Sequence, residues 1–319
     1  MKLWLAIAGL VLAGTVSNTR AEERFALVLS GASGGPKYAE QMREWRNAIS
    51  TALIDRYGFP KDKVRVFVDE TVKTGDSGTA QNVRAAMAEL RKQMTRQDLL
   101  VIVLLGHGTY DGDIAKFNLV GPDLTAAEWK TLLDGVPARL VMVNTTEASF
   151  PFLARLSGAN RVVITATDSA AQKYATVFPD YFAKAMTAAS TDMDKNGRTS
   201  IFEVFAATSA AVKQHYEQRG QLTTERAVID DNGDGVGREA EAPGPDGAMA
   251  RLLYLDADTP AAANDPALAA LIRRRRELEA EAEALKQQKG VLPAAAWTSE
   301  FERLMLELAK VSREIKGRS

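Results

Sequence analysis

The stretch VIVLLGHGTYDG, Val101–Gly112, has the pattern of a central strand and the turn that follows it. Its first five residues are aliphatic, and Gly-His-Gly follows them at once. An apolar run of this length that ends in small residues is typical of a buried strand followed by a tight turn. His107, one of only two histidines, therefore lies at the end of a predicted strand.

Segments with strand and helix patterns alternate around this stretch. Strands are predicted at 24–30, 63–70, 98–108, 138–146, 160–169 and 250–256, and helices at 38–57, 78–94, 125–133, 179–190 and 201–216. The third helix opens with Thr125 and Glu128, which are spaced as a capping box. This alternation predicts an α/β fold with a largely parallel sheet and helices on both faces, in which ligands bind beyond the carboxyl ends of the strands.

Composition excludes several classes of protein and site. The chain has 319 residues, a net charge of −1 and no cysteine. The near-neutral charge gives no electrostatic reason to expect nucleic acid or an anionic membrane as a partner. The lack of cysteine excludes disulfides, thiolate metal sites and a cysteine nucleophile.

The first 21 residues have the pattern of a signal peptide. Lys2 precedes the apolar run LWLAIAGLVLAG, and Thr19 and Ala21 lie at the positions that a signal peptidase reads. The alternative is an N-terminal membrane anchor, but the run is shorter than the ~20 residues that a span needs. We expect cleavage after Ala21, a periplasmic or secreted mature protein, and no membrane contact after cleavage.

Several motifs occur in an order that resembles a known family. They are VLSGASGG, the helix ending in YGFP, a valine-rich strand ending in Asp69-Glu70, the strand ending in Gly-His-Gly, and TATDSA after the strand at 160–169. Their order over about Phe25 to the 170s is similar to that of the caspase-fold cysteine peptidases, most closely the legumain type. The resemblance implies a caspase-like sheet and a peptide-binding cleft.

The resemblance also implies roles for individual residues. His107 would be the general base, the backbone N–H of Gly108 would help bind the oxyanion, and the position of the catalytic cysteine falls on Thr146. Threonine is a poor replacement because its hydroxyl has a far higher pKa than a thiol and its β-branch restricts χ1. Three interpretations of His107 stay open: the remnant of a dyad in an inactive peptidase, the base for a hydroxyl nucleophile (Thr146 or Ser149), or an ordinary histidine at a strand end.

A stronger chemical signal lies downstream, in DMDKNGRTSIFE, Asp192–Glu203. It matches the calcium-loop template D-x-[DN]-x-[DN]-G-x5-E at every fixed position. The alternating oxygens point inward and Gly197 permits the sharp turn. The predicted ligands are Asp192, Asp194, Asn196, the Arg198 carbonyl, Ser200 and Glu203.

A second match to the same template is DDNGDGVGREAE, Asp230–Glu241. Gly237 replaces the usual apolar residue, and Pro243 and Gly244 forbid an exit helix. The predicted ligands are Asp230, Asn232, Asp234, the Val236 carbonyl and Glu241. The sequence therefore predicts one calcium ion and leaves open whether this loop binds a second.

The C-terminal region changes character after a linker rich in Pro, Ala and Asp. Leu271, Leu278 and Leu285 recur every seven residues, and the apolar residues of 301–315 recur at three and four. This pattern predicts two charged helices, at 266–288 and 293–316, that form an antiparallel, coiled-coil-like hairpin. The expected domains are therefore a signal peptide (1–21), a caspase-like domain (22–260) and a helical hairpin (264–319).

Three functions remain open from the sequence. The first is an exported peptidase-fold protein that is inactive as a cysteine peptidase, binds calcium, and takes a peptide or protein ligand in its cleft. The second is an active hydrolase that uses His107 with the hydroxyl of Thr146 or Ser149. The third is a calcium-stabilised scaffold that recruits a protein partner through its C-terminal hairpin.

Overall fold

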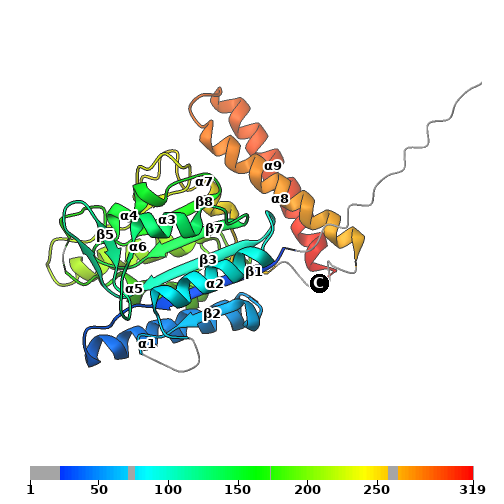
Figure 1. The fold of residues 1–319 in the computed structure, drawn as a ribbon. Coiled ribbons are helices and arrows are strands. Elements are labelled where there is room, and N and C mark those ends of the chain that lie inside the picture. The colour runs from blue at the N-terminus through cyan, green and yellow to red at the C-terminus, as the bar shows by residue number, and fades with distance from the viewer. Residues whose placement is uncertain (1–21, 71–75, 173, 258–264, 319) are drawn as a thin grey trace, which may run out of the picture.

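A six-stranded sheet forms the centre of the computed structural model, which describes residues 22–70, 76–172, 174–257 and 265–318. The strand order is β2-β1-β3-β7-β8-β9, and only β9 runs antiparallel to its neighbour. The strands are β1 (Arg24–Ser30), β2 (Val64–Phe67), β3 (Leu99–Leu105), β7 (Arg139–Asn144), β8 (Arg161–Thr165) and β9 (Val228–Asp230). The predicted α/β fold with a largely parallel sheet is confirmed (Figure 1).

Helices cover both faces of this sheet, as the alternation of segments predicts. One face carries α1 (Pro36–Thr51), α5 (Phe178–Thr187) and α6 (Ile201–Glu217), and the other carries α2 (Ala80–Gln93), α3 (Ala126–Leu133) and α4 (Phe150–Leu156). A π-helical turn, η1 (Ala52–Arg56), continues α1, and two short 3-10 turns are η2 (Lys61–Lys63) and η3 (Ala189–Thr191).

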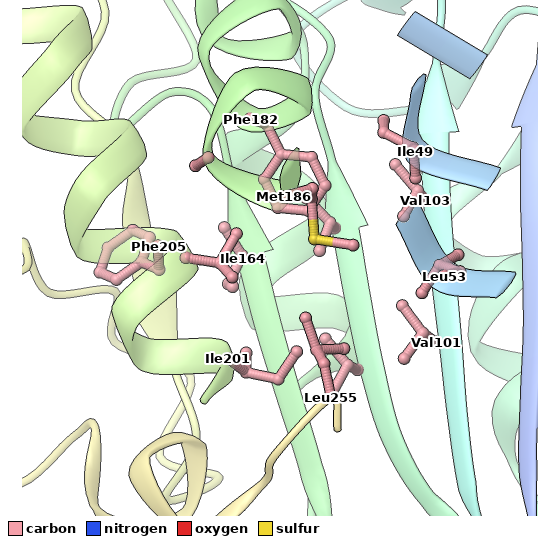
Figure 2. Close-up of a cluster of buried hydrophobic side chains, with 14 of the residues drawn as sticks. Ile49, Leu53, Val101, Val103, Ile164, Phe182, Met186, Ile201, Phe205 and Leu255 are labelled. Atoms are coloured by element: carbon pink, nitrogen blue, oxygen red, sulfur yellow. The ribbon is translucent and has the colours of Figure 1, made fainter. Parts of the chain in front are cut away.

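The central strand β3 is buried on both faces, which explains its uninterrupted apolar run. Val101 and Val103 face the cluster that contains Leu53 and Phe182 (Figure 2). Ile102 faces the opposite cluster, against α2 and α3. Because both faces are covered, the strand needs no polar alternation, and the polar residues begin only where it ends.

A small antiparallel sheet begins directly after His107. It consists of β4 (Gly108–Tyr110), β5 (Ala115–Phe117) and β6 (Leu124–Thr125). Thr125 is also the N-cap of α3: its hydroxyl accepts from the Glu128 N–H at 3.1 Å, and the Glu128 carboxylate accepts from the Thr125 N–H at 2.9 Å. The predicted capping box is therefore confirmed.

The strand predicted at 250–256 is wrong. Residues Ala248–Leu252 form a short helix, α7, and Tyr254 makes only an isolated bridge to Ser200. Gly247 starts this helix with a φ of 89°, and the buried Asp231 carboxylate accepts the N–H groups of Gly247 and Ala250 at 2.8 Å each. These bonds come from a residue distant in sequence, so the local apolar pattern does not reveal them.

The C-terminal residues form a pair of helices, α8 (Pro266–Gln287) and α9 (Ala294–Lys316), that pack along each other. The pair has its own hydrophobic cluster and projects beside the sheet domain (Figure 1). Glu279 of α8 pairs with Arg198, and the buried Glu283 pairs with Arg251 at 3.5 Å. These ion pairs join the hairpin to the body.

The predicted signal peptide, 1–21, and most of the predicted linker, 258–264, lie outside the described residues. Within the described part of the chain, no helix is both long and apolar enough to cross a bilayer.

Candidate functional site

The Gly-His-Gly segment lies at the carboxyl end of β3, beside the end of β7. Gly106 has a φ of 150°, which side chains rarely adopt. A Cβ at Gly108 would lie 2.7 Å from the hydroxyl oxygen of Thr146. Gly108 therefore lets the backbone after His107 pack directly on the residue at the predicted nucleophile position.

The half-buried His107 pairs with Glu147, a contact that the sequence did not predict. The distance from Nδ1 to the Glu147 Oε1 is 3.3 Å, and the Tyr38 ring makes a T-shaped contact with the imidazole at 4.8 Å between centroids. The hydrogen bond with Glu147 raises the pKa of His107, burial opposes it, and the Glu147 charge and a bond to the Ser33 backbone add to the rise. The ring is therefore an acid–base group with a carboxylate partner.

The hydroxyl groups of the two candidate nucleophiles, Thr146 and Ser149, form hydrogen bonds with residues other than His107. Thr146 is fully buried, and its hydroxyl donates to the Asn144 Oδ1 at 2.9 Å. Ser149 is also fully buried and shares a hydrogen bond with the Thr167 hydroxyl at 3.0 Å. Among the described contacts, neither hydroxyl bonds to His107. The geometry therefore gives no support to a hydroxyl nucleophile activated by this histidine.

The Glu147 contact predicts how His107 titrates. We expect its pKa above 6.5 in the wild type and at or below 6.5 in Glu147→Gln, because burial then acts with little opposition. The pair stabilises the fold below pH 6.5, and this contribution is lost as the pH rises through the raised pKa. NMR titration of the two histidines measures both values.

His215 serves as the internal reference for that titration. Its Nδ1 lies 2.9 Å from the Tyr181 hydroxyl, and burial lowers its pKa. Its titration curve should therefore lie below 6.5 and stay unchanged in Glu147→Gln. An unchanged His107 curve in that variant would show that Glu147 is not the partner that sets its pKa.

The predicted calcium loop, Asp192–Glu203, brings three acidic side chains to one point. Carboxylate oxygens of Asp192, Asp194 and Glu203 lie within 4.8 Å of one another, the one such group among the described residues. Asp192 also accepts the N–H groups of Asn196 at 3.1 Å and Gly197 at 2.9 Å, so the loop wraps around its first residue. Calcium prefers several hard oxygen ligands around one centre, and this donor set fits it.

Two other predicted ligands of this loop, Ser200 and Arg198, have side chains that bond to acidic residues. The Ser200 hydroxyl forms a capping box with Glu203 at the start of α6, accepting from its N–H at 3.2 Å. The Arg198 side chain turns away onto Glu279. Burial raises the pKa of Asp194, and the nearby charges of Glu203 and Asp192 raise it further. A bound divalent cation would relieve that repulsion.

The second loop keeps only part of its predicted ligand set together. Asp230 is buried at the end of β9, and its carboxylate accepts the N–H groups of Gly233 at 2.9 Å and Gly235 at 2.8 Å. The predicted closing residue, Glu241, instead pairs with Lys213 at 2.7 Å and is 70% exposed. The structure therefore does not bring Glu241 to the loop.

One cavity lies away from His107, between α6, α7 and the C-terminal helices, and has a volume of about 790 Å³. Its walls include Phe202, Tyr254, Met305 and Leu308, and it reaches the acidic loop 192–203 at Asp194 and Glu203.

Comparison with known proteins gives a short likeness to a peptidase. No family model matches the chain. A segment of 57 residues, 18% of this chain, is 37% identical to Metacaspase-4 of Arabidopsis thaliana and covers 13% of that protein. Metacaspases are caspase-fold cysteine peptidases, and this likeness together with the mainly parallel sheet fits a caspase-like fold.

Proposed function

We propose that the protein is a caspase-like, peptidase-fold protein that binds calcium and a peptide or protein segment, and does not cleave by a cysteine mechanism. The observation that carries this proposal is the pairing of His107 with Glu147 while Thr146, at the nucleophile position, is fully buried and bonded to Asn144. A histidine to which neither candidate hydroxyl bonds is able to bind a ligand but does not activate either of them for attack.

Sequence motifs support the finer parts of the proposal. The legumain-type order of motifs favours an extended peptide as the ligand beside His107. The pattern of residues 1–21 supports export to the periplasm or beyond. In that compartment calcium is abundant, so the acidic loop 192–203 would bind it as a stabilising ion.

Peptide binding is tested with fluorescent extended peptides and the full chain in calcium buffer. We expect His107→Ala to weaken binding about tenfold, or ~1.4 kcal/mol, because the ring lies with the partly exposed Tyr38 at the carboxyl end of β3. Leu306→Ala, an exposed side chain on α9, is the control and should leave the affinity unchanged. Fluorescence anisotropy measures both.

The opposite effects of the two variants would place the binding site away from His107. If Leu306→Ala weakens binding and His107→Ala does not, the helical hairpin carries the interaction and the proposed site beside His107 is wrong. If the wild type binds none of the peptides, the tested peptides are excluded as ligands.

A further inference from the structure

The C-terminal helix α8 contacts the body through two acidic residues that lie one helical turn apart. Glu279 pairs with Arg198, and Glu283 pairs with Arg251 at 3.5 Å. Residues four apart in a helix share one face, so both ion pairs lie on the same side of α8. The Glu279 and Glu283 side chains are only 9% and 7% exposed. Such a pair depends on its geometry, because moving one partner away leaves the other charge buried and unpaired.

Arg198 belongs to the predicted calcium loop 192–203 as well as to this contact. It is residue 7 of the loop, where the backbone carbonyl is a predicted ligand, and its N–H donates to the Asn196 Oδ1 at 2.8 Å. Its guanidinium group lies over the Tyr254 ring, 3.5 Å from the centroid, and pairs with Glu279. The backbone of this residue is therefore part of the loop, while its side chain reaches α8.

The second ion pair also begins beside the loop. The Arg251 guanidinium lies over the ring of Phe202, 3.4 Å from its centroid, and Phe202 lies in the first turn of α6, directly after the N-cap Ser200. Tyr254 forms an isolated bridge with Ser200, and its hydroxyl accepts from the Asn196 side chain at 3.4 Å. Each arginine that reaches α8 therefore lies over a ring that contacts or adjoins the loop.

The loop and the hairpin also face a shared cavity. The cavity of about 790 Å³ between α6, α7 and the hairpin is lined by Asp194 and Glu203 of the loop, by Ala282 and Met305 of the hairpin, and by all four residues of the two ion pairs. Side chains do not fill this part of the interface. Because the hairpin has its own hydrophobic cluster, separate from the two clusters of the sheet, its release would leave the core of the sheet closed.

A bound ion changes the charge and the rigidity of the loop. Without it, carboxylate oxygens of Asp192, Asp194 and Glu203 lie within 4.8 Å of one another and repel. Calcium removes this repulsion and fixes its oxygen ligands, including the carbonyl at position 7. The ion thus fixes the backbone from which Arg198 reaches α8. The acid on α8 has a second partner in its own helix, Arg275 at 3.7 Å, so it keeps a cation beside it when α8 leaves the body.

We propose that calcium bound in the loop 192–203 holds the C-terminal hairpin on the body, and that Arg198 connects the ion to α8 through Glu279. This inference rests on the calcium site of the proposed function and adds what the ion regulates. Because linked binding equilibria are reciprocal, a docked hairpin tightens calcium binding by the same factor by which calcium favours docking. Loss of the ion releases the hairpin and uncovers the acidic face of α8.

Two spin labels on the full chain measure whether the hairpin is docked. The natural chain has no cysteine, so Glu44→Cys on the exposed side of α1 and Leu306→Cys on α9 provide two specific labelling sites. Double electron–electron resonance measures the distances between them. We expect a narrow distance distribution in calcium and loss of that narrow distribution after a chelator is added.

Two variants of this doubly labelled parent test the connection through Glu279. Glu279→Gln removes the charge that Arg198 reaches, so the narrow distribution should be lost even in calcium. Glu277→Gln is the matched control, since this exposed residue of the same helix pairs with Arg274 of α8 at 3.4 Å, and it should keep the distribution of the parent. Circular dichroism checks that both variants keep their helices. The chelator comparison needs neither variant, so it tests the inference even if Glu279→Gln does not fold.

Isothermal titration with calcium chloride separates this inference from the proposed function. We expect Glu279→Gln to bind calcium about fivefold more weakly than the parent, and Glu277→Gln to bind it as the parent does. Calcium binding to the parent, with a distance distribution that the chelator does not change, would overturn the inference and leave the calcium site standing. A parent that binds no calcium would overturn the calcium site itself and the inference with it.

Discussion

Removing calcium should lower the melting temperature of this protein by roughly 5–10 °C when the ion is otherwise present at a hundredfold excess over its Kd. Binding at that excess stabilises the folded state by about 2.7 kcal/mol, and each kcal/mol shifts the melting temperature of a domain of this size by about 2–4 °C. The cause is local: without the ion, the carboxylates of Asp192, Asp194 and Glu203 lie within 4.8 Å of one another. Differential scanning calorimetry with and without a calcium chelator measures the shift.

Two variants separate the effect of the ion from the effect of a helix cap. Asp192→Asn keeps the capping box of α6 but removes a ligand charge, so most of the shift caused by the chelator should disappear. Thr125→Ala removes the N-cap hydroxyl of α3, which costs about 1 kcal/mol, but should leave the shift in place. A melting temperature that the chelator does not change, with calcium initially in excess, would rule out a stabilising ion.

The fold was predictable because its signals are local. The aliphatic run of β3 and the capping box at Thr125 and Glu128 lie within single segments, and the structure has the predicted elements there. The strand predicted at 250–256 was wrong because α7 depends on Asp231, whose carboxylate accepts the N–H groups that start the helix. No pattern within 250–256 indicates that long-range partner.

The candidate sites show the same division between local and long-range information. Residue order alone located His107 at a strand end, but its pairing with Glu147 depends on how the ends of β3 and β7 meet in space. Similarly, Glu241 satisfies the loop template in sequence, whereas in space it pairs with Lys213. A template of fixed spacing cannot anticipate where the turn at Pro243 and Gly244 directs the chain.

Replacing Thr146 with cysteine should create peptide hydrolysis in a protein that otherwise has none. A thiol has a pKa near 8.5 and is partly ionised at neutral pH, whereas the threonine hydroxyl is not. Cysteine also lacks the β-branch, so its sulfur is less restricted to the direction of Asn144. In this background, His107→Ala should reduce turnover by about 10²- to 10⁴-fold, the usual contribution of a general base.

Leu306→Ala in the same cysteine background is the control, since its side chain is exposed on α9 and distant in sequence from both residues. Turnover should be unchanged in it and should vanish when the thiol is alkylated. Cysteine-dependent turnover that survives His107→Ala would show that the histidine is not positioned to serve residue 146.

Peptide-library hydrolysis with the wild-type chain in calcium buffer, run beside His107→Ala and Thr146→Cys, tests whether His107 has a carboxylate partner but no nucleophile among the described residues. The expected result is no cleavage by the wild type or by His107→Ala, and cleavage by Thr146→Cys. Wild-type cleavage that His107→Ala abolishes would contradict the claim, because it would require a nucleophile that His107 already activates.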